Sequence, residues 1–136
     1  MTTTENLHYA IGELAYAVAS VGGRIQHNDR QKFHDIIIAE LHAHQADFDI
    51  SGIVFQMMYK MKMDTETTYK WAMKDIKLNS HYLSPELKQT FIDIIERIAA
   101  AYPHNASREY NIVERFKRDI KPLIGDPIYY GYAMAD

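Results

Sequence analysis

Residues 27–49 carry the side chains most able to bind a metal ion. Four of the seven histidines lie there: His27, His34, His42 and His44. Glu40 and His44 are four residues apart, which places them on one side of a helix. Together with Asp47 or Asp49 they form a candidate transition-metal site. The alternative is a hydrogen-bonded Glu40–His44 pair, satisfied in the core or reaching water at a helix end.

Two further acidic residues each follow a turn between helices. Asp29 lies seven positions after Gly22 in the segment SVGGRIQHNDRQKF, residues 20–33. Glu109 lies seven positions after Tyr102 in the second turn. In the first of these turns, the Gly-Gly pair followed by Ile25 and Asp29 looks like the remains of an acidic, metal-binding loop. An acid near the start of a helix also caps it and favours its N-terminal dipole, and we expect this role for both residues.

Catalytic motifs are missing from the sequence. The chain contains no cysteine, which excludes thiol nucleophiles and thiolate metal sites. It contains no Gly-x-Ser-x-Gly elbow, no His-Glu-x-x-His zinc motif and no phosphate-binding glycine loop. We therefore expect a protein that is not an enzyme and needs no cofactor other than a divalent metal.

Two groups of apolar residues suggest an interaction surface. Met57, Met58, Met61 and Met63 follow one another at helical spacing, which is typical of core filling or of an adaptable groove for a peptide or lipid chain. Tyr129, Tyr130 and Tyr132 lie in a C-terminal segment too apolar for a solvated tail. They pack on the domain or dock a partner chain. Met57, Met61 and the three tyrosines are the predicted surface.

Apolar residues recur with helical periodicity along nearly the whole chain. The pattern predicts a first helix over residues 5–20, a second over 28–44 and a sixth over 107–121. Capping residues mark the start of the other three. Asp49 or Ser51 caps the third helix, Asp64 caps the fourth, and Ser84-Pro85 begins the fifth. The third is expected to bury Ile53, Met57, Met58 and Met61, and the fourth Trp71, Ile76 and Leu78. This predicts an all-α bundle of about six helices. Residues 1–124 form the helical domain, and residues 125–136 form an aromatic tail, with helix breakers at Gly125 and Pro127.

The first and last helical hairpins align when the chain is shifted by 80 residues. Ile11 then matches Phe91, and Leu14 matches Ile94. Further apolar positions follow in step through both hairpins, although Glu40 matches Ile120. We interpret this as an internal repeat of two helical hairpins.

The segments ELAYAVASVGGRIQHND and DIIERIAAAYPHNASRE resemble the tellurite-resistance TerB-like family over most of residues 7–121. In that family, duplicated hairpins each carry an Ala-Asp-Gly turn, then Ile or Val, then Glu. Gly23, Ile25 and Asp29 fit this pattern, and Glu109 is the main match in the second hairpin. The resemblance implies an all-helical fold, an acidic and metal-binding surface, and a role in stress response without catalysis.

The chain departs from the family pattern where the turn aspartates would stand. Gly22 and Tyr102 replace them, and Pro103 replaces the second glycine. Because calcium takes six to eight oxygen ligands, Asp29 and Glu109 alone do not complete such a site.

Composition limits the classes of partner. The formal net charge is −3, so no overall basic field favours nucleic acid. No apolar run approaches the ~20 residues that span a bilayer. We expect a cytoplasmic, non-catalytic interaction or sensor module that binds a protein partner or self-associates, without nucleic acid or membrane. The alternative is a metal-binding protein that uses Glu40, His44 and Asp47.

Overall fold

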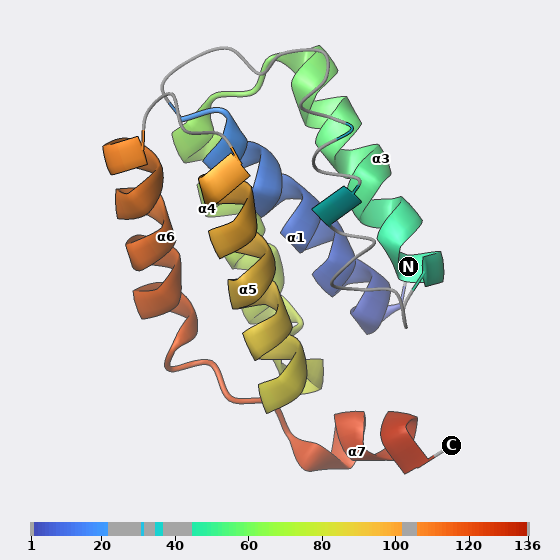
Figure 1. Ribbon diagram of the computed structural model, residues 1–136. Coiled ribbons are helices and arrows are strands. Elements are labelled where there is room, and N and C mark those ends of the chain that lie inside the picture. Colours follow the sequence, from blue (N-terminus) through green and yellow to red (C-terminus); the bar gives the residue numbers. More distant parts are fainter. Residues whose placement is uncertain (1, 22–30, 32–34, 37–44, 102–105, 136) are drawn as a thin grey trace.

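The computed structural model describes residues 2–21, 31, 35–36, 45–101 and 106–135, and the side chains of 45–49, 106–110 and 132–135 are not among them. All its described secondary structure is helical, as predicted (Figure 1). The α-helices are α1 (Thr3–Ala19), α3 (Gln45–Met61), α4 (Thr65–Leu78), α5 (Pro85–Ala101), α6 (Ala106–Ile120) and α7 (Pro127–Ala135), with a short 3₁₀ helix η2 (Ser80–Tyr82).

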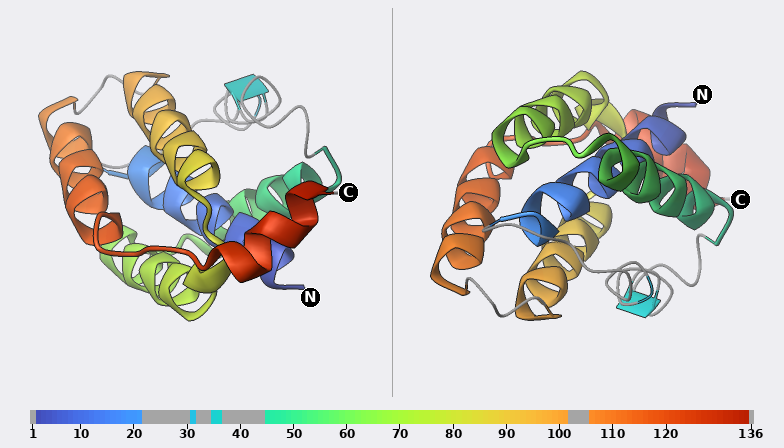
Figure 2. Two further views of the ribbon diagram at one scale, coloured as in Figure 1. Left: turned by 90° about the horizontal axis from the view of Figure 1, so that it is seen from below. Right: turned by 90° about the horizontal axis from the view of Figure 1, so that it is seen from above.

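Helix α1 lies at the centre of the bundle. Helices α3, α4, α5 and α6 all contact it, and both end-on views show them arranged around it (Figure 2). Every residue from Ala10 to Ala19 is buried as a result. The core also includes Phe55, Tyr69, Phe91 and Phe116 from the surrounding helices. A helix that is apolar on all sides is one that neighbours surround, and α1 fits this rule.

Local capping signals begin three of the helices. The Thr2 hydroxyl accepts from the Glu5 amide at 3.1 Å while the Glu5 carboxylate accepts from the Thr2 amide at 2.8 Å, a capping box. Asp64 caps α4 by accepting from Thr67 N at 2.9 Å, and Ser84 Oγ accepts from Leu87 N at 3.0 Å. The predicted caps at Asp64 and Ser84 are therefore confirmed.

Helices α1 and α3 cross at very close range. A Cβ placed on Gly12 would lie 2.6 Å from the Ser51 carbonyl oxygen and 3.1 Å from Val54 Cβ. At the same crossing Ser51 Oγ donates to the His8 carbonyl at 2.6 Å. The His8 ring is buried beside Phe91, with Nδ1 donating to the Thr4 carbonyl at 2.9 Å. Only a residue without a side chain fits at position 12.

The predicted start of the third helix was wrong. Helix α3 begins at Gln45, so Asp49 and Ser51 both lie inside it. The Ser51 hydroxyl bonds across to α1, and this contact between helices is why a cap-type residue stands within a helix.

The predicted apolar faces of α3 and α4 were also partly wrong. On α3 the side facing α1 carries Val54, Phe55 and Met58, each at most 3% exposed. Ile53, Met57 and Met61 point outward and are 59%, 42% and 59% exposed. On α4, Ile76 is buried as expected, but Trp71 and Leu78 are 45% and 66% exposed. The spacing admitted either side of the helix, and the crossing at Gly12 decides which side meets α1.

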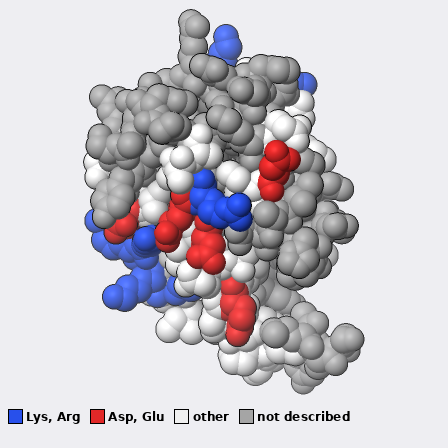
Figure 3. Space-filling view, viewed as in Figure 1, with Lys and Arg blue, Asp and Glu red and all other residues white. Residues whose placement is uncertain are grey.

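Helices α5 and α6 pack against each other and carry charged side chains on their outer sides. Lys117 Nζ lies 3.1 Å from the Glu96 carboxylate and 3.5 Å from that of Glu114. Among the coloured residues of the face in Figure 3, basic and acidic side chains adjoin one another. The described part of this face is thus of mixed charge.

The predicted aromatic tail forms helix α7, although Gly125 and Pro127 were interpreted as helix breakers. Pro127 occupies the first helical position, and the Asp126 carboxylate accepts from the Ile128 amide at 3.0 Å. The segment is anchored on η2, because Asp126 N donates to the His81 carbonyl at 2.9 Å. The Tyr129 ring also packs on His81 and Tyr82, with centroids 4.9 and 5.4 Å apart. Tyr129 thus packs on the domain, one of the two predicted outcomes.

Candidate functional site

Glu13 is an acidic residue on a buried helix. It lies in the middle of α1, between Gly12 and Leu14, and is 2% exposed. Because helices surround α1, the short Glu side chain does not reach solvent. Sequence reasoning missed this residue. The signal was present in AIGELAYAVA, residues 10–19, where one carboxylate interrupts an otherwise apolar helical segment.

The Glu13 carboxyl group is hydrogen-bonded to the carboxyl group of Asp75 on α4. Two carboxylates form such a bond only if one of them carries a proton, so the pair shares one proton. Burial, the hydrogen bond to Asp75 and the negative charge of Asp75 raise the pKa of Glu13 to about 9. The protonated Glu13 therefore donates to Asp75 at neutral pH.

One oxygen of Glu13 has no hydrogen-bond partner among the described residues. This atom, Oε1, is buried. An unsatisfied buried polar atom costs about 1–3 kcal/mol of stability. A group kept at such a cost is a candidate for a binding role.

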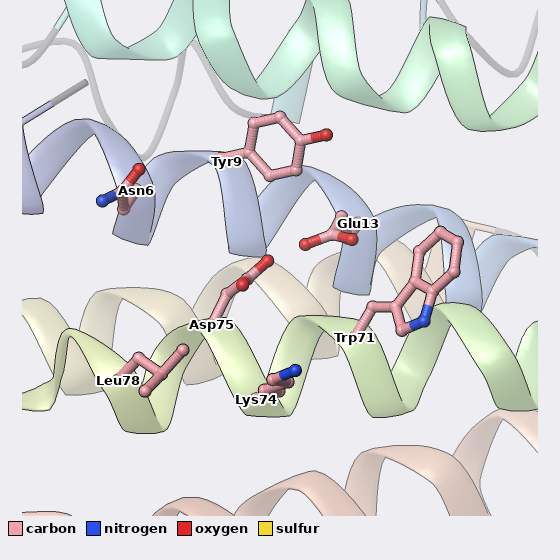
Figure 4. Close-up of a pocket in the computed structure, with 7 residues that line it drawn as sticks. All are labelled: Asn6, Tyr9, Glu13, Trp71, Lys74, Asp75 and Leu78. Carbon is pink, nitrogen blue, oxygen red and sulfur yellow. The ribbon is translucent and has the colours of Figure 1, made fainter.

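A cavity of about 500 Å³ opens to solvent between α1 and α4, beside this carboxyl pair (Figure 4). Its lining consists of Asn6, Tyr9 and Glu13 from α1 and Trp71, Lys74, Asp75 and Leu78 from α4. Both sets follow helical spacing of three and four residues, which places each set on one side of its helix. Figure 4 shows the carboxyl groups of Glu13 and Asp75 turned toward each other across the gap between the two helices.

The other lining residues differ in polarity around the cavity. Asn6 Nδ2 donates to Asn79 Oδ1 at 3.3 Å, which connects the start of α1 to the end of α4. Burial and the charges of Glu13 and Asp75 raise the pKa of Tyr9, so its hydroxyl stays protonated. Trp71, Lys74 and Leu78 are exposed at the rim. The cavity therefore has an acidic inner part and a largely apolar outer part.

A second polar cluster, between α4 and α6, is fully paired. Tyr69 OH donates to Asp119 Oδ2 at 2.7 Å, and the Arg115 guanidinium lies 4.1 Å above the Tyr69 ring. Arg115 also donates to both oxygens of Glu66, at 2.7 and 2.8 Å. A shallow depression of about 290 Å³ lies beside Arg115. Since these charges already have partners, the cluster is best explained as a structural connection between the helices.

The predicted metal ligands fall outside what the structure describes. Glu40, His44 and Asp29 lie in the undescribed segments. Asp47 lies on α3 and Glu109 on α6, but their side chains are not described. Among the described residues, no three His, Asp or Glu side chains are grouped so as to hold a metal ion.

The predicted interaction residues are placed in part. Met57 and Met61 are exposed on α3, together with Ile53. Tyr129 is 43% exposed and Tyr130 is half-buried, while the Tyr132 side chain is not described. The predicted repeat pairs Ile11 with Phe91, and both are fully buried. Any two core helices would show the same burial, so the repeat stays a prediction.

Within the described residues, no helix has the length and apolar character needed to cross a membrane. Comparisons with models of protein families, with curated proteins and with solved structures found no match. The resemblance to the TerB-like family therefore rests on the sequence motifs alone.

Proposed function

We propose that this protein is a non-catalytic sensor module that binds a small positively charged ligand in the cavity between α1 and α4. One observation carries the proposal: the buried carboxyl of Glu13 faces Asp75 at this cavity, with one oxygen unpaired among the described residues. A positive charge placed here would satisfy both carboxyl groups at once.

The energetics of the pair support a binding role. Without a ligand, Glu13 stays neutral beside Asp75 by keeping its proton, and its Oε1 still has no partner in the described part of the chain. A glutamine at this position could donate to Asp75 without that titration, so stability alone does not favour a glutamate. A cationic ligand would explain why this position is a glutamate, because the ligand stabilises the ionised pair of carboxylates.

A ligand reaches Glu13 only through the cavity. The Glu13 side chain is 2% exposed, and it lines this cavity together with Asp75. A charged group held there lies close to both carboxyl groups. The resemblance to the TerB-like family agrees with a sensor role in stress response.

Thermal unfolding tests the proposal. We would measure the melting temperature at pH 8 with calcium, magnesium, n-butylammonium and n-butylguanidinium chlorides, each matched in ionic strength with NaCl. Binding to the folded state should raise the melting temperature by mass action. The rise should disappear in Glu13→Gln and persist in Glu86→Gln, which removes an exposed carboxyl on α5. Equal behaviour of the two variants, or no rise with any cation, would reject the proposal.

A second candidate function is self-association through the outer side of α3. Ile53, Met57 and Met61 repeat every four residues, and all three are exposed. We propose that this stripe pairs with the same stripe of a second copy around a twofold axis, the commonest symmetry of homo-oligomers. Methionines adapt well to such contacts.

Sedimentation equilibrium tests this second candidate. The wild-type chain should form dimers at high micromolar concentration, and Met57→Glu should remain monomeric. Gln56→Glu adds the same charge at a neighbouring exposed position and is the matched control. A monomeric wild type over this range would rule out pairing through α3.

A further inference from the structure

We infer that the ligand of the cavity between α1 and α4 is an organic cation, an ammonium or guanidinium group on a short apolar stem, whose charge pairs with Asp75 and Glu13 and whose stem packs on Trp71 and Leu78. This inference rests on the proposed function and names the chemical class of its ligand.

The outer part of the cavity provides apolar contact surface. Trp71 is 45% exposed and Leu78 is 66% exposed, and both line the cavity on the side of α4. They flank Asp75 at intervals of four and three residues along one side of the helix. An indole beside a carboxylate attracts organic cations, because its face adds a cation–π contact to the charge pair.

The size and composition of the cavity favour a molecule over a bare ion. A volume of about 500 Å³ lies in the range of small-molecule sites. Hard cations such as calcium require six to eight oxygen ligands at close range. Among the described lining residues, side-chain oxygens come from Asn6, Tyr9, Glu13 and Asp75. The others are Trp71, Leu78 and the basic Lys74.

Charge balance predicts that the ligand displaces a proton. Without ligand, Glu13 and Asp75 share one proton and one negative charge. The arriving cation compensates a second negative charge, so the proton leaves Glu13 for solvent and no covalent bond changes. Among the described residues that line the cavity, the other titratable side chains are Tyr9, whose raised pKa keeps its hydroxyl protonated, and Lys74.

Replacing Lys74 should change the affinity for the ligand in the direction opposite to replacing Glu13. Lys74 is exposed at the rim and is the one basic side chain among the described residues that line the cavity. Its charge repels a cationic ligand, so Lys74→Gln should strengthen binding while Glu13→Gln weakens it. A change that merely disturbed the fold would not move the affinity in both directions.

The fluorescence of Trp71 reports binding directly, because Trp71 is the one tryptophan of the chain. We would titrate n-butylammonium and n-butylguanidinium at pH 7, with n-butanol as the neutral analogue and calcium and magnesium as inorganic cations. The two organic cations should cause a saturable change, and n-butanol should cause none. Affinity should fall roughly tenfold or more in Glu13→Gln and rise in Lys74→Gln.

Proton release gives an independent readout. Calorimetry in phosphate and in Tris should show release of close to one proton for each organic cation bound by the wild type, and none for Glu13→Gln. Asp75→Asn serves as a second variant that removes the paired carboxyl; it should also lose the binding. Circular dichroism checks that each variant is folded.

The outcomes separate this inference from the proposed function. A Trp71 response to calcium or magnesium that needs Glu13, without a response to the organic cations, would overturn the inference and leave the proposed function standing. If n-butanol changed the Trp71 fluorescence as much as the organic cations do, the ligand would not need a positive charge, and the inference would be overturned. No Glu13-dependent response to any of the cations would overturn both.

Discussion

The carboxyl group of Glu13 on α1 is hydrogen-bonded to the carboxyl group of Asp75 on α4, although the two residues are far apart in the chain. The proton of this bond is carried by Glu13, at the edge of the cavity between α1 and α4. The bond makes the packing of α1 against α4 sensitive to pH, because removal of the proton leaves two negative charges in contact.

Glu13→Gln should remove a pH dependence of stability. The pKa of Glu13 is raised from 4.5 to about 9 in the folded state, so the folded chain holds a proton that the unfolded chain releases. Stability from this group is therefore full below about pH 4.5 and is lost as the pH rises toward 9. At pH 8 the variant should be more stable than the wild type by up to about 5 kcal/mol, with little difference at pH 4.5.

Urea unfolding at pH 4.5, 6 and 8 measures this difference. Asp75→Asn should reduce the pH dependence only in part, because burial is the largest cause of the raised pKa of Glu13. Parallel stability curves for wild type and Glu13→Gln would show that Glu13 has an ordinary pKa.

Gly12→Ala should destabilise the fold, whereas Gly52→Ala should not. A methyl group at position 12 would meet the backbone of Ser51, and α1 and α3 would have to separate. The expected cost is about 1–3 kcal/mol. At Gly52, also within a helix, no described residue beyond its own helix backbone and chain neighbours comes within 4 Å of an added Cβ, so alanine should stabilise by up to about 1 kcal/mol. Chemical denaturation of the two variants compares them, and a neutral Gly12→Ala would contradict the close crossing.

Tyr69→Phe should cost about 1–2 kcal/mol. The hydroxyl of this buried tyrosine donates to Asp119 at 2.7 Å, and bonds to charged acceptors are among the stronger ones. Asp119 is one-third exposed and regains water, which keeps the cost moderate. Tyr82→Phe is the matched control and should change the unfolding free energy by less than about 0.5 kcal/mol. Similar unfolding free energies for both variants would show that the bond between Tyr69 and Asp119 does not stabilise the fold.

Phe91→Ala and Ile98→Ala should each cost about 2–5 kcal/mol, because both side chains are fully buried and their loss leaves cavities. Ile124 is 83% exposed, so Ile124→Ala should have little effect. Thermal or urea unfolding measures all three. If the core variants unfold like the wild type, α5 does not pack as described.

Capping signals in the sequence located helix ends well where they depend on adjacent residues. Asp64 and Ser84-Pro85 begin α4 and α5 as predicted, since a cap bonds amides two or three positions away. The same kind of signal, Asp126 followed by Pro127, begins α7 and was overlooked because the glycine and proline were interpreted only as helix breakers. Ser51 was predicted as a cap and is not one, because its hydroxyl bonds to another helix and not to adjacent amides.

The sequence by itself determined the helical class and most helix boundaries, because helix hydrogen bonds and caps join residues at most a few positions apart. Only the tertiary structure decided which side of each helix is buried and which polar groups meet. Periodicity left open which side of α3 faces α1, and the tight fit of Gly12 against Ser51 turned Met57 and Met61 outward. The pairing of Glu13 with Asp75 likewise depends on how α1 and α4 pack, a contact between distant residues that no local pattern encodes.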